Sequence, residues 1–221
     1  MTEILVANKS HVKYAETVCS LMYESALKRG TGIAKRSPEY IAKKMEEGKA
    51  IVAIDGDRLI GFSYIESWQH KRFVANSGLI VDPEYRNTGL ARKIKRAIFD
   101  LSRRLYPDAK IFSITTGLAV MKLNSELGYV PVTFSELTDD DDFWKGCEGC
   151  RNYHILQENN RRMCLCTGML YDPEKHKAAT ETENPEADRD VNAVREMIPE
   201  KVLSPKRIAQ LRKNLRKIHL I

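Results

Sequence analysis

The stretch that decides the fold is Val81-Asp82-Pro83-Glu84-Tyr85-Arg86-Asn87-Thr88-Gly89-Leu90-Ala91. It follows a β-rich run that begins at Phe73, and it leads into a run with helical spacing of apolar residues that ends near Leu105. The first turn of a helix carries backbone N–H groups without partners and the positive end of the helix dipole. A strand, a short loop and a glycine-opened helix therefore predict a site for an anion.

The residue types in this loop favour a pyrophosphate. Gly89 and the small Ala91 allow a diphosphate to approach the backbone, where a larger side chain would block it. Arg86 and Arg92 can add charge-assisted hydrogen bonds. In the helix that follows, Ile94, Ala97, Ile98 and Leu101 predict one apolar face, and we expect the Arg and Lys residues on the opposite face.

Outward from this loop, residues 1–134 alternate strand-like and helix-like stretches, which predicts an α/β layer architecture. The turn Asp55-Gly56-Asp57 between two β-rich runs predicts a hairpin. Ser37-Pro38 is a helix start signal, with serine as the cap. We expect strands at 4–6, 50–54, 59–65, 73–81, 111–115 and 129–134, and helices at 12–27, 38–47, 89–105 and 118–127.

The pattern Arg86-x-x-Gly89-x-Ala91 after a strand resembles the (Gln/Arg)-x-x-Gly-x-(Gly/Ala) motif of the GNAT N-acetyltransferase superfamily. The element order and the ending Leu127-Gly128-Tyr129 are also similar to that family, and the likeness covers residues 1–134 of the 221. It implies an α/β (α+β) GNAT fold, a mixed central sheet flanked by helices. We expect this acyl-CoA-binding domain at residues 1–138.

The resemblance implies an N-acyltransferase with acetyl-CoA, or another acyl-CoA, as co-substrate. Its pantetheine would lie between residues 79–81 and 111–115, and the acyl group would pass directly to a primary amine in a ternary complex. The implied coenzyme-binding residues are Leu79, Ile80, Val81, Arg86, Asn87, Thr88, Gly89, Leu90, Ala91, Arg92 and Asn124.

Acyl transfer to an amine requires a base, because an alkylammonium with a pKa near ~10 is not a nucleophile at neutral pH. Glu66 is the nearest acidic residue that could act through a water, and a solvated strand end is the alternative reading. The thioester oxygen needs a donor, which in the family is a backbone N–H of the strand at about Leu79 to Val81.

The departing thiolate also needs a proton. Many GNAT proteins have a tyrosine four residues before the glycine of the Leu-Gly ending, and Asn124 occupies that position here. An amide can hydrogen-bond the sulfur or the pantetheine but cannot protonate the thiolate. Water, Tyr129 and Tyr153 remain as alternative proton sources.

Residues 139–171 form an extension with two cysteine pairs, Cys147/Cys150 and Cys164/Cys166. Thiolates at such spacing predict a tetrahedral Cys₄ site for a structural zinc ion. Reduced core thiols, or a redox pair or another metal, are the alternatives. The extension also resembles a bacterial GNAT subgroup that acylates amino acids such as glutamate, which implies that Arg36, Lys71 or Arg72 pairs with a substrate carboxylate.

Residues 172–221 divide into an acidic part followed by a basic part. Residues 172–200 contain nine acids and four bases, and we expect a flexible acidic linker at 172–203. Residues 201–221 contain seven bases and no acid, and residues 204–221 predict a basic amphipathic helix. This tail supports an alternative function, an RNA- or ribosome-associated binding module with a degenerate GNAT body.

The composition and the order of residues argue against several classes of protein. No apolar run approaches the ~18 residues of a membrane helix, so no membrane span is expected. The sequence starts without a basic segment and an apolar stretch of the export type, and its five cysteines are an odd number, which together predict a cytoplasmic protein. Because residues 1–171 carry a net charge of only +4, we expect no nucleic acid partner for the body. A homodimer is in keeping with the family resemblance.

Overall fold

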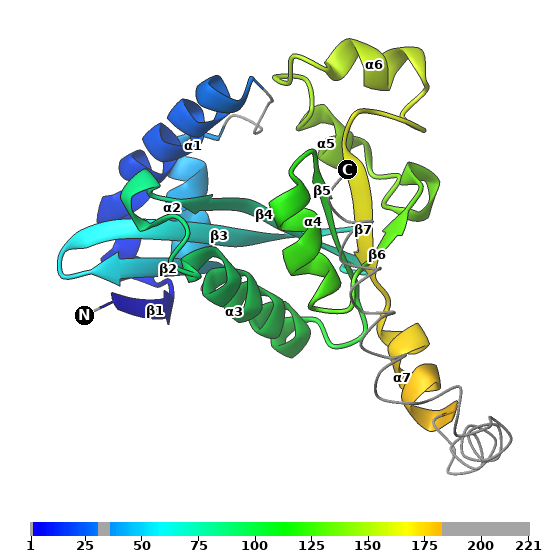
Figure 1. Ribbon diagram of the computed structural model, residues 1–221, viewed down its shortest axis with the longest axis horizontal. Helices are drawn as coiled ribbons and strands as arrows, with labels where there is room; N and C mark the ends of the chain where they lie inside the picture. The colour runs from blue at the N-terminus through cyan, green and yellow to red at the C-terminus, as the bar shows by residue number, and fades with distance from the viewer. Residues whose placement is uncertain (1, 31–35, 183–221) are drawn as a thin grey trace, which may run out of the picture. The chain divides into compact units, whose positions relative to one another are not determined.

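The computed structural model describes residues 2–30 and 36–182. Within them, the strands form a seven-stranded sheet of order β1-β2-β3-β4-β5-β7-β6 (Figure 1). Only β4 and β5 pair in parallel; the other neighbours are antiparallel. The strands are β1 Thr2–Val6, β2 Ala50–Asp55, β3 Arg58–Trp68, β4 Phe73–Val81, β5 Lys110–Thr115, β6 Val130–Val132 and β7 Thr167–Tyr171.

The helices of the described residues include long ones packed on the sheet and short ones in the extension. They are α1 Ala15–Arg29, α2 Pro38–Glu46, α3 Leu90–Leu105, α4 Leu118–Ser125, α5 Asp141–Lys145, α6 Tyr153–Glu158 and α7 Pro173–Thr182. Ser37 caps α2 by accepting a hydrogen bond from the backbone of Tyr40, as its Ser-Pro signal predicts. No helix in these segments is both long enough and apolar enough to cross a membrane.

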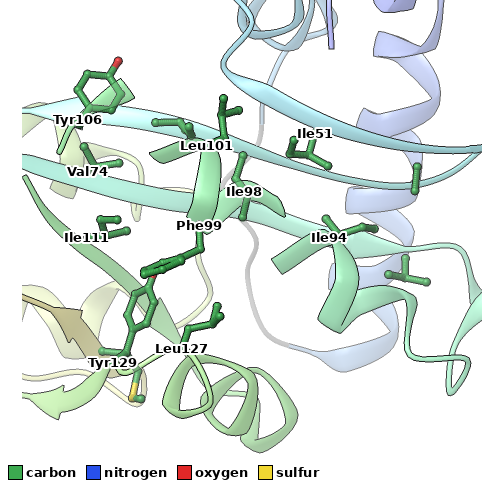
Figure 2. Packing of buried hydrophobic residues seen from close by; sticks show 14 of the residues in the cluster. Ile51, Val74, Ile94, Ile98, Phe99, Leu101, Tyr106, Ile111, Leu127 and Tyr129 are labelled. Carbon is green, nitrogen blue, oxygen red and sulfur yellow. The ribbon is translucent and has the colours of Figure 1, made fainter. Parts of the chain in front are cut away.

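Helices cover both faces of the sheet, so apolar side chains are buried on each face. Along β2, Ile51 and Ala53 belong to the core cluster that contains α3, whereas Ala50 and Val52 belong to the cluster that contains α1 and α2. Figure 2 shows the first cluster, where the side chains of α3 meet those of the strands. This two-sided burial confirms the predicted α/β fold with a mixed sheet and the predicted Asp55-Gly56-Asp57 hairpin.

The extension belongs to the same compact unit, residues 1–174, as the sheet. Its strand β7 lies between β5 and β6, with Ile111 opposite Tyr171 and Val130 opposite Leu170. The predicted boundary after residue 138 therefore lies inside this unit. Strand β7 was not predicted, since its partners are far away in the sequence.

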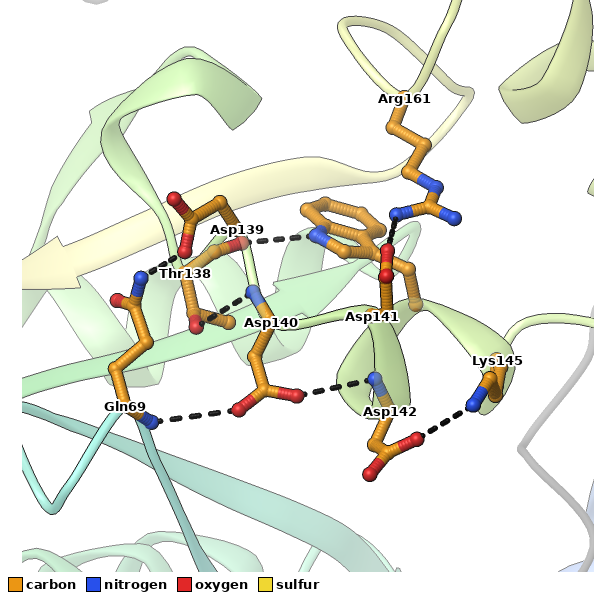
Figure 3. Close-up of polar contacts among 9 residues, drawn as sticks. Gln69, Thr138, Asp139, Asp140, Asp141, Asp142, Lys145 and Arg161 are labelled. Atoms are coloured by element: carbon orange, nitrogen blue, oxygen red, sulfur yellow. Dashed lines mark hydrogen bonds and ion pairs between the residues drawn. The ribbon is translucent and has the colours of Figure 1, made fainter.

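The run of four aspartates anchors the extension (Figure 3). Asp140 caps α5 by accepting from the backbone of Asp142, and Gln69 of the β3–β4 turn is hydrogen-bonded to Asp139 and Asp140. The indole N–H of Trp144 donates to the backbone oxygen of Thr138 at 2.8 Å. These contacts fix the start of α5, whose Phe143 lines a cavity beside β4 and β5.

Part of the predicted flexible linker is helical instead. Helix α7 occupies residues 173–182, where Pro173 is at the first helical position and the Asp172 carboxylate accepts from the backbone of Glu174 at 3.1 Å. The reason is local: Asp-Pro is a strong start signal that outweighs the polar composition. The rest of the predicted linker, 183–203, and the predicted basic helix, 204–221, lie outside the described residues.

Candidate functional site

The parallel strands β4 and β5 separate shortly after they begin to pair. Their register runs from Phe73 opposite Lys110 to Ala75 opposite Phe112 and is not continued beyond that point. A cavity of about 210 Å³ opens beside the diverging strands. Its wall consists of Arg36, Tyr64, Glu66, Ala75, Asn76, Ser77, Gly78, Leu79, Lys95, Phe112, Ser113, Ile114, Thr115, Thr116, Val120, Phe143, Gly146, Cys147, Cys150 and Cys166.

The predicted anion loop connects β4 to α3. Gly89 immediately precedes α3 with φ 82°, and no side chain caps the N-terminus of that helix. A Cβ atom added at Gly89 would meet nothing within 4 Å, so the space in front of the first turn is open. Asn87 also has a positive φ, 63°, a conformation that asparagine tolerates better than most residues. The loop therefore presents backbone donors to solvent at the positive end of a 16-residue helix.

The two arginines predicted to hydrogen-bond a diphosphate at this loop have different surroundings. Arg86 is exposed, and its Nε donates to the backbone oxygen of Val81 at 3.3 Å. Arg92 forms two hydrogen bonds with Glu126 at 2.7 and 2.9 Å, joining α3 to α4. The Arg92 guanidinium thereby holds the pKa of Glu126 below its usual range. Arg92 must leave this pair, or share it, to contact an anion.

A β-bulge shapes the cavity wall on β4. Phe62 pairs with Ile80 and Tyr64 pairs with Ser77, so two residues of β4 face one residue of β3. One of the two is Gly78, with φ 65°, where an added Cβ would lie 2.5 Å from a ring carbon of Tyr64. A bulge leaves a residue outside the hydrogen-bond ladder. The bulge also lies next to the predicted oxyanion segment, Leu79 to Val81.

Glu66 is buried at the cavity, with 4% exposure, so the solvated strand end weighed for it is wrong. Arg36 Nη2 lies 3.2 Å from Glu66 Oε1, and the Tyr40 hydroxyl donates to the same oxygen. The Ser77 hydroxyl donates to Oε2 at 2.8 Å. Both carboxylate oxygens thus already accept hydrogen bonds from protein donors.

Asn124 and Tyr129 are both buried, and neither is part of the described cavity wall. The Asn124 amide donates to Ser113 Oγ at 2.8 Å, and its Oδ1 has no hydrogen-bond partner among the described residues. The Tyr129 hydroxyl donates to Asn76 Oδ1 at 3.0 Å, and burial raises its pKa well above the usual value. Tyr129 is therefore poorly placed and poorly suited to release a proton into the cavity.

Lys95 was missed by sequence reasoning. The prediction that all Arg and Lys residues of α3 face solvent is wrong for it, because its side chain is 2% exposed and part of the cavity wall. The available signal was its position next to Ile94 and four residues before Phe99, two buried residues of the same helix. The buried face of α3 is thus wider than the four apolar positions indicated.

The cysteines gather at the cavity wall formed by the extension. Cys147, Cys150 and Cys166 line the cavity, and Cys164 interacts with Cys166. Burial, with repulsion from the neighbouring thiols, raises the pKa of Cys147 to about 11 and that of Cys166 to about 12. Across residues 2–30 and 36–182, no group of three or more His, Cys, Asp or Glu side chains is placed to hold a metal ion. The predicted structural zinc thus has no support in the structure.

The three cations suggested for a substrate carboxylate are not equivalent. Arg36 is part of the cavity wall, with 18% of its side chain exposed. Lys71 and Arg72 are exposed in the turn between β3 and β4 and are not part of that wall.

Comparison with known proteins agrees with this fold. The chain resembles N-acetylglutamate synthase from Neisseria gonorrhoeae, solved with coenzyme A and N-acetyl-glutamate, at 14% identity and a TM-score of 0.56. That match covers 78% of this chain and only 35% of the synthase chain. Rv2747 from Mycobacterium tuberculosis, solved with CoA and NLQ, matches at 14% identity and a TM-score of 0.54 over 77% of this chain and 98% of that one.

A third solved structure, yncA from Salmonella typhimurium with its cofactor acetyl-CoA, matches at 14% identity and a TM-score of 0.54, covering 78% of this chain and 94% of that one. No curated protein sequence matches the chain. The acetyltransferase (GNAT) family, in contrast, matches residues 20–123, which include the cavity strands, the predicted anion loop and most of α4. The chain therefore carries an acetyltransferase domain of the GNAT family.

Proposed function

We propose that this chain transfers an acetyl or other short acyl group from acyl-CoA to a primary amine in a ternary complex. The observation that carries the proposal is the uncapped, glycine-opened start of α3, which follows β4 and its adjoining cavity. A diphosphate at that helix end leaves a pantetheine chain free to run into the gap between β4 and β5, and so brings the thioester to the cavity.

Strand β4 supplies the next part of the mechanism. The bulge at Gly78 and Leu79 supports a backbone N–H as donor to the thioester oxygen, which becomes negative when the amine attacks. Such a donor is fixed by the sheet before the reaction begins, so it needs no rearrangement as the charge develops.

Glu66 is the base of this proposal, acting through a water. Its carboxylate oxygens already accept hydrogen bonds from Arg36, Tyr40 and Ser77, which fix its position in the cavity wall. A water between the amine and the carboxylate would carry the proton without disturbing these contacts.

The proposed acceptor is the amino group of an amino acid such as glutamate. Arg36 supports this choice, because a guanidinium in the cavity wall can pair with a substrate carboxylate. The wall is completed by Phe143, Cys147 and Cys150 of the extension, which would limit the size of the acceptor. A thiol-release screen of acetyl-CoA and succinyl-CoA against glutamate, aspartate, ornithine and a polyamine tests both the donor and the acceptor.

Coenzyme A binding tests the proposal most directly. The Gly89→Asp variant places a carboxylate in front of α3, in a backbone conformation that aspartate tolerates, and repels a diphosphate. We expect calorimetry to show affinity for coenzyme A lowered by about tenfold or more, roughly 1.4 kcal/mol. Gly56→Asp is the matched control, since Gly56 also has a positive φ and open space around it. Absence of coenzyme A binding by the unaltered protein would refute the proposal.

The alternative of an RNA- or ribosome-binding module depends on the basic residues 201–221, which lie outside the described residues. The family match favours the enzyme. Salt-titrated RNA binding by the full chain, compared with protection from unfolding by acetyl-CoA, separates the two functions.

A further inference from the structure

Lys95 is a buried lysine at the cavity between β4 and β5. It lies on α3, the helix whose start forms the anion loop, and its side chain is 2% exposed. Its Nζ lies 4.8 Å from the centre of the Tyr129 ring. On the cavity wall it is accompanied by Asn76 of β4 and Ser113 of β5. The lysine therefore belongs to the gap that the pantetheine would enter.

The other charged side chains of the wall, Arg36 and Glu66, pair with each other. The remaining titratable groups there are Tyr64, Cys147, Cys150 and Cys166. Burial alone lowers the pKa of Lys95 to about 7, and no carboxylate of the described residues contributes to that shift. On the outer side of α3, Lys95 also borders a groove with Arg92, Lys93, Arg96, Asp100 and Glu126.

A buried ammonium without a counter-ion is costly, so its presence here needs a reason. Breaking a thioester creates a negative sulfur in the gap, and this anion would compensate the charge of Lys95. The side chains considered above for protonating the sulfur are weak candidates: Asn124 is an amide, the Tyr129 hydroxyl is bound to Asn76, and Tyr153 is not part of the cavity wall.

We propose that Lys95 donates a proton to the sulfur of coenzyme A as the thioester bond breaks. This step rests on the proposed function. The amine nitrogen forms the new C–N bond, the C–S bond breaks, and its electron pair goes to sulfur, which takes a proton from Nζ of Lys95. The nitrogen loses its surplus proton to water held by Glu66, and solvent returns one proton to Lys95. A lysine that titrates near neutral pH transfers its proton readily to a thiolate whose conjugate acid has a pKa of about 8.5.

Leaving-group rescue tests the step. Turnover of Lys95→Met is measured with acetyl-CoA and with the selenium analogue of acetyl-CoA, using the amine that gives the fastest thiol release in the screen above. We expect a loss of about 100-fold or more with the thioester. The loss with the selenoester should be at least tenfold smaller, because a selenolate leaves without protonation. Equal losses with both donors, or no loss with either, would overturn the proposal.

Two further variants serve as controls. One tests whether the positive charge alone is sufficient, and the other tests whether any lysine substitution on this helix affects turnover. Lys95→Arg keeps a positive charge that does not dissociate near neutral pH, so we expect it to behave like Lys95→Met; full activity of Lys95→Arg would instead show an electrostatic role and overturn the proposal. Lys93→Met, at an exposed position of the same helix, should leave turnover unchanged. If the unaltered protein binds no coenzyme A, the proposed function fails; if it is active and Lys95→Met shows no donor dependence, only this inference fails.

Discussion

The guanidinium of Arg36 lies 3.2 Å from the carboxylate of Glu66 and joins the segment before α2 to strand β3. The two side chains are 18% and 4% exposed, so the pair is largely shielded from water. Arg36 also donates to the Tyr64 hydroxyl at 3.0 Å, and Tyr40 donates to Glu66. The wall of the cavity is thus held by a connected set of hydrogen bonds between residues distant in the sequence.

Removing one partner of this pair should destabilise the protein. We expect Arg36→Met to lower the free energy of unfolding by about 3 kcal/mol, because it leaves the Glu66 carboxylate buried without its cation. Urea unfolding measures the change, and the double variant Arg36→Met/Glu66→Met should recover most of it. Lys145→Met, which breaks an exposed pair with Asp142, is the control and should have no measurable effect. Equal losses of stability in Arg36→Met and Lys145→Met would contradict the prediction.

Glu66→Gln tests the base. The amide keeps the shape of the side chain but cannot take up the proton of the amine, so we expect kcat/KM to fall by about 100-fold or more. Glu84→Gln, at an exposed glutamate outside the cavity wall, serves as the control. An unaltered pH–rate profile for Glu66→Gln would remove Glu66 from the mechanism.

The loop between β4 and α3 could be predicted from the sequence because its signals are local. A strand end, a proline, a glycine and a helix start lie within nine residues, from Val81 to Gly89, and each acts through the backbone of its own segment. The same holds for the hairpin at Asp55-Gly56-Asp57 and for the capped start of α2. The structure adds that no side chain caps α3, which leaves room for a ligand.

The cavity wall could not be predicted in the same way because its contacts are long-range. Arg36 and Tyr40 reach Glu66 across 30 and 26 residues, and Ser77 reaches it from the next strand. Strand β7 enters the sheet beside β5, so the extension packs against the site. A periodicity argument records which face of one element is apolar, but it does not record which segment covers that face.

The bulge on β4 gives a further prediction. Gly78→Ala places a methyl group 2.5 Å from the Tyr64 ring, in a left-handed conformation. We expect the free energy of unfolding to fall by about 3 kcal/mol, from the backbone strain and the clash together. Gly56→Ala has the same sign of φ but no neighbour within 4 Å, so it should lose only about 1 kcal/mol. Equal losses in thermal or urea unfolding would show that the ring of Tyr64 moves away freely.

The lowered pKa of Lys95 predicts how the free energy of unfolding of the ligand-free protein depends on pH. Its pKa is lowered by burial from 10.5 to about 7, so between these values the unfolded chain binds a proton that the folded protein does not. Stability therefore rises with pH across this window, and below pH 7 the full cost of burying the charge is present. Lys95→Met removes that cost.

We accordingly expect Lys95→Met to be more stable than the unaltered protein at pH 7, by up to roughly 5 kcal/mol. The difference should shrink by about 1.4 kcal/mol for each pH unit above 7, because the unaltered protein gains stability while the variant does not. Urea unfolding at pH 6, 7, 8 and 9 measures this slope, and Lys93→Met provides a flat reference. A difference that stays constant from pH 7 to 9 would mean that burial does not lower the pKa of Lys95, and the cost that its function must explain would be absent.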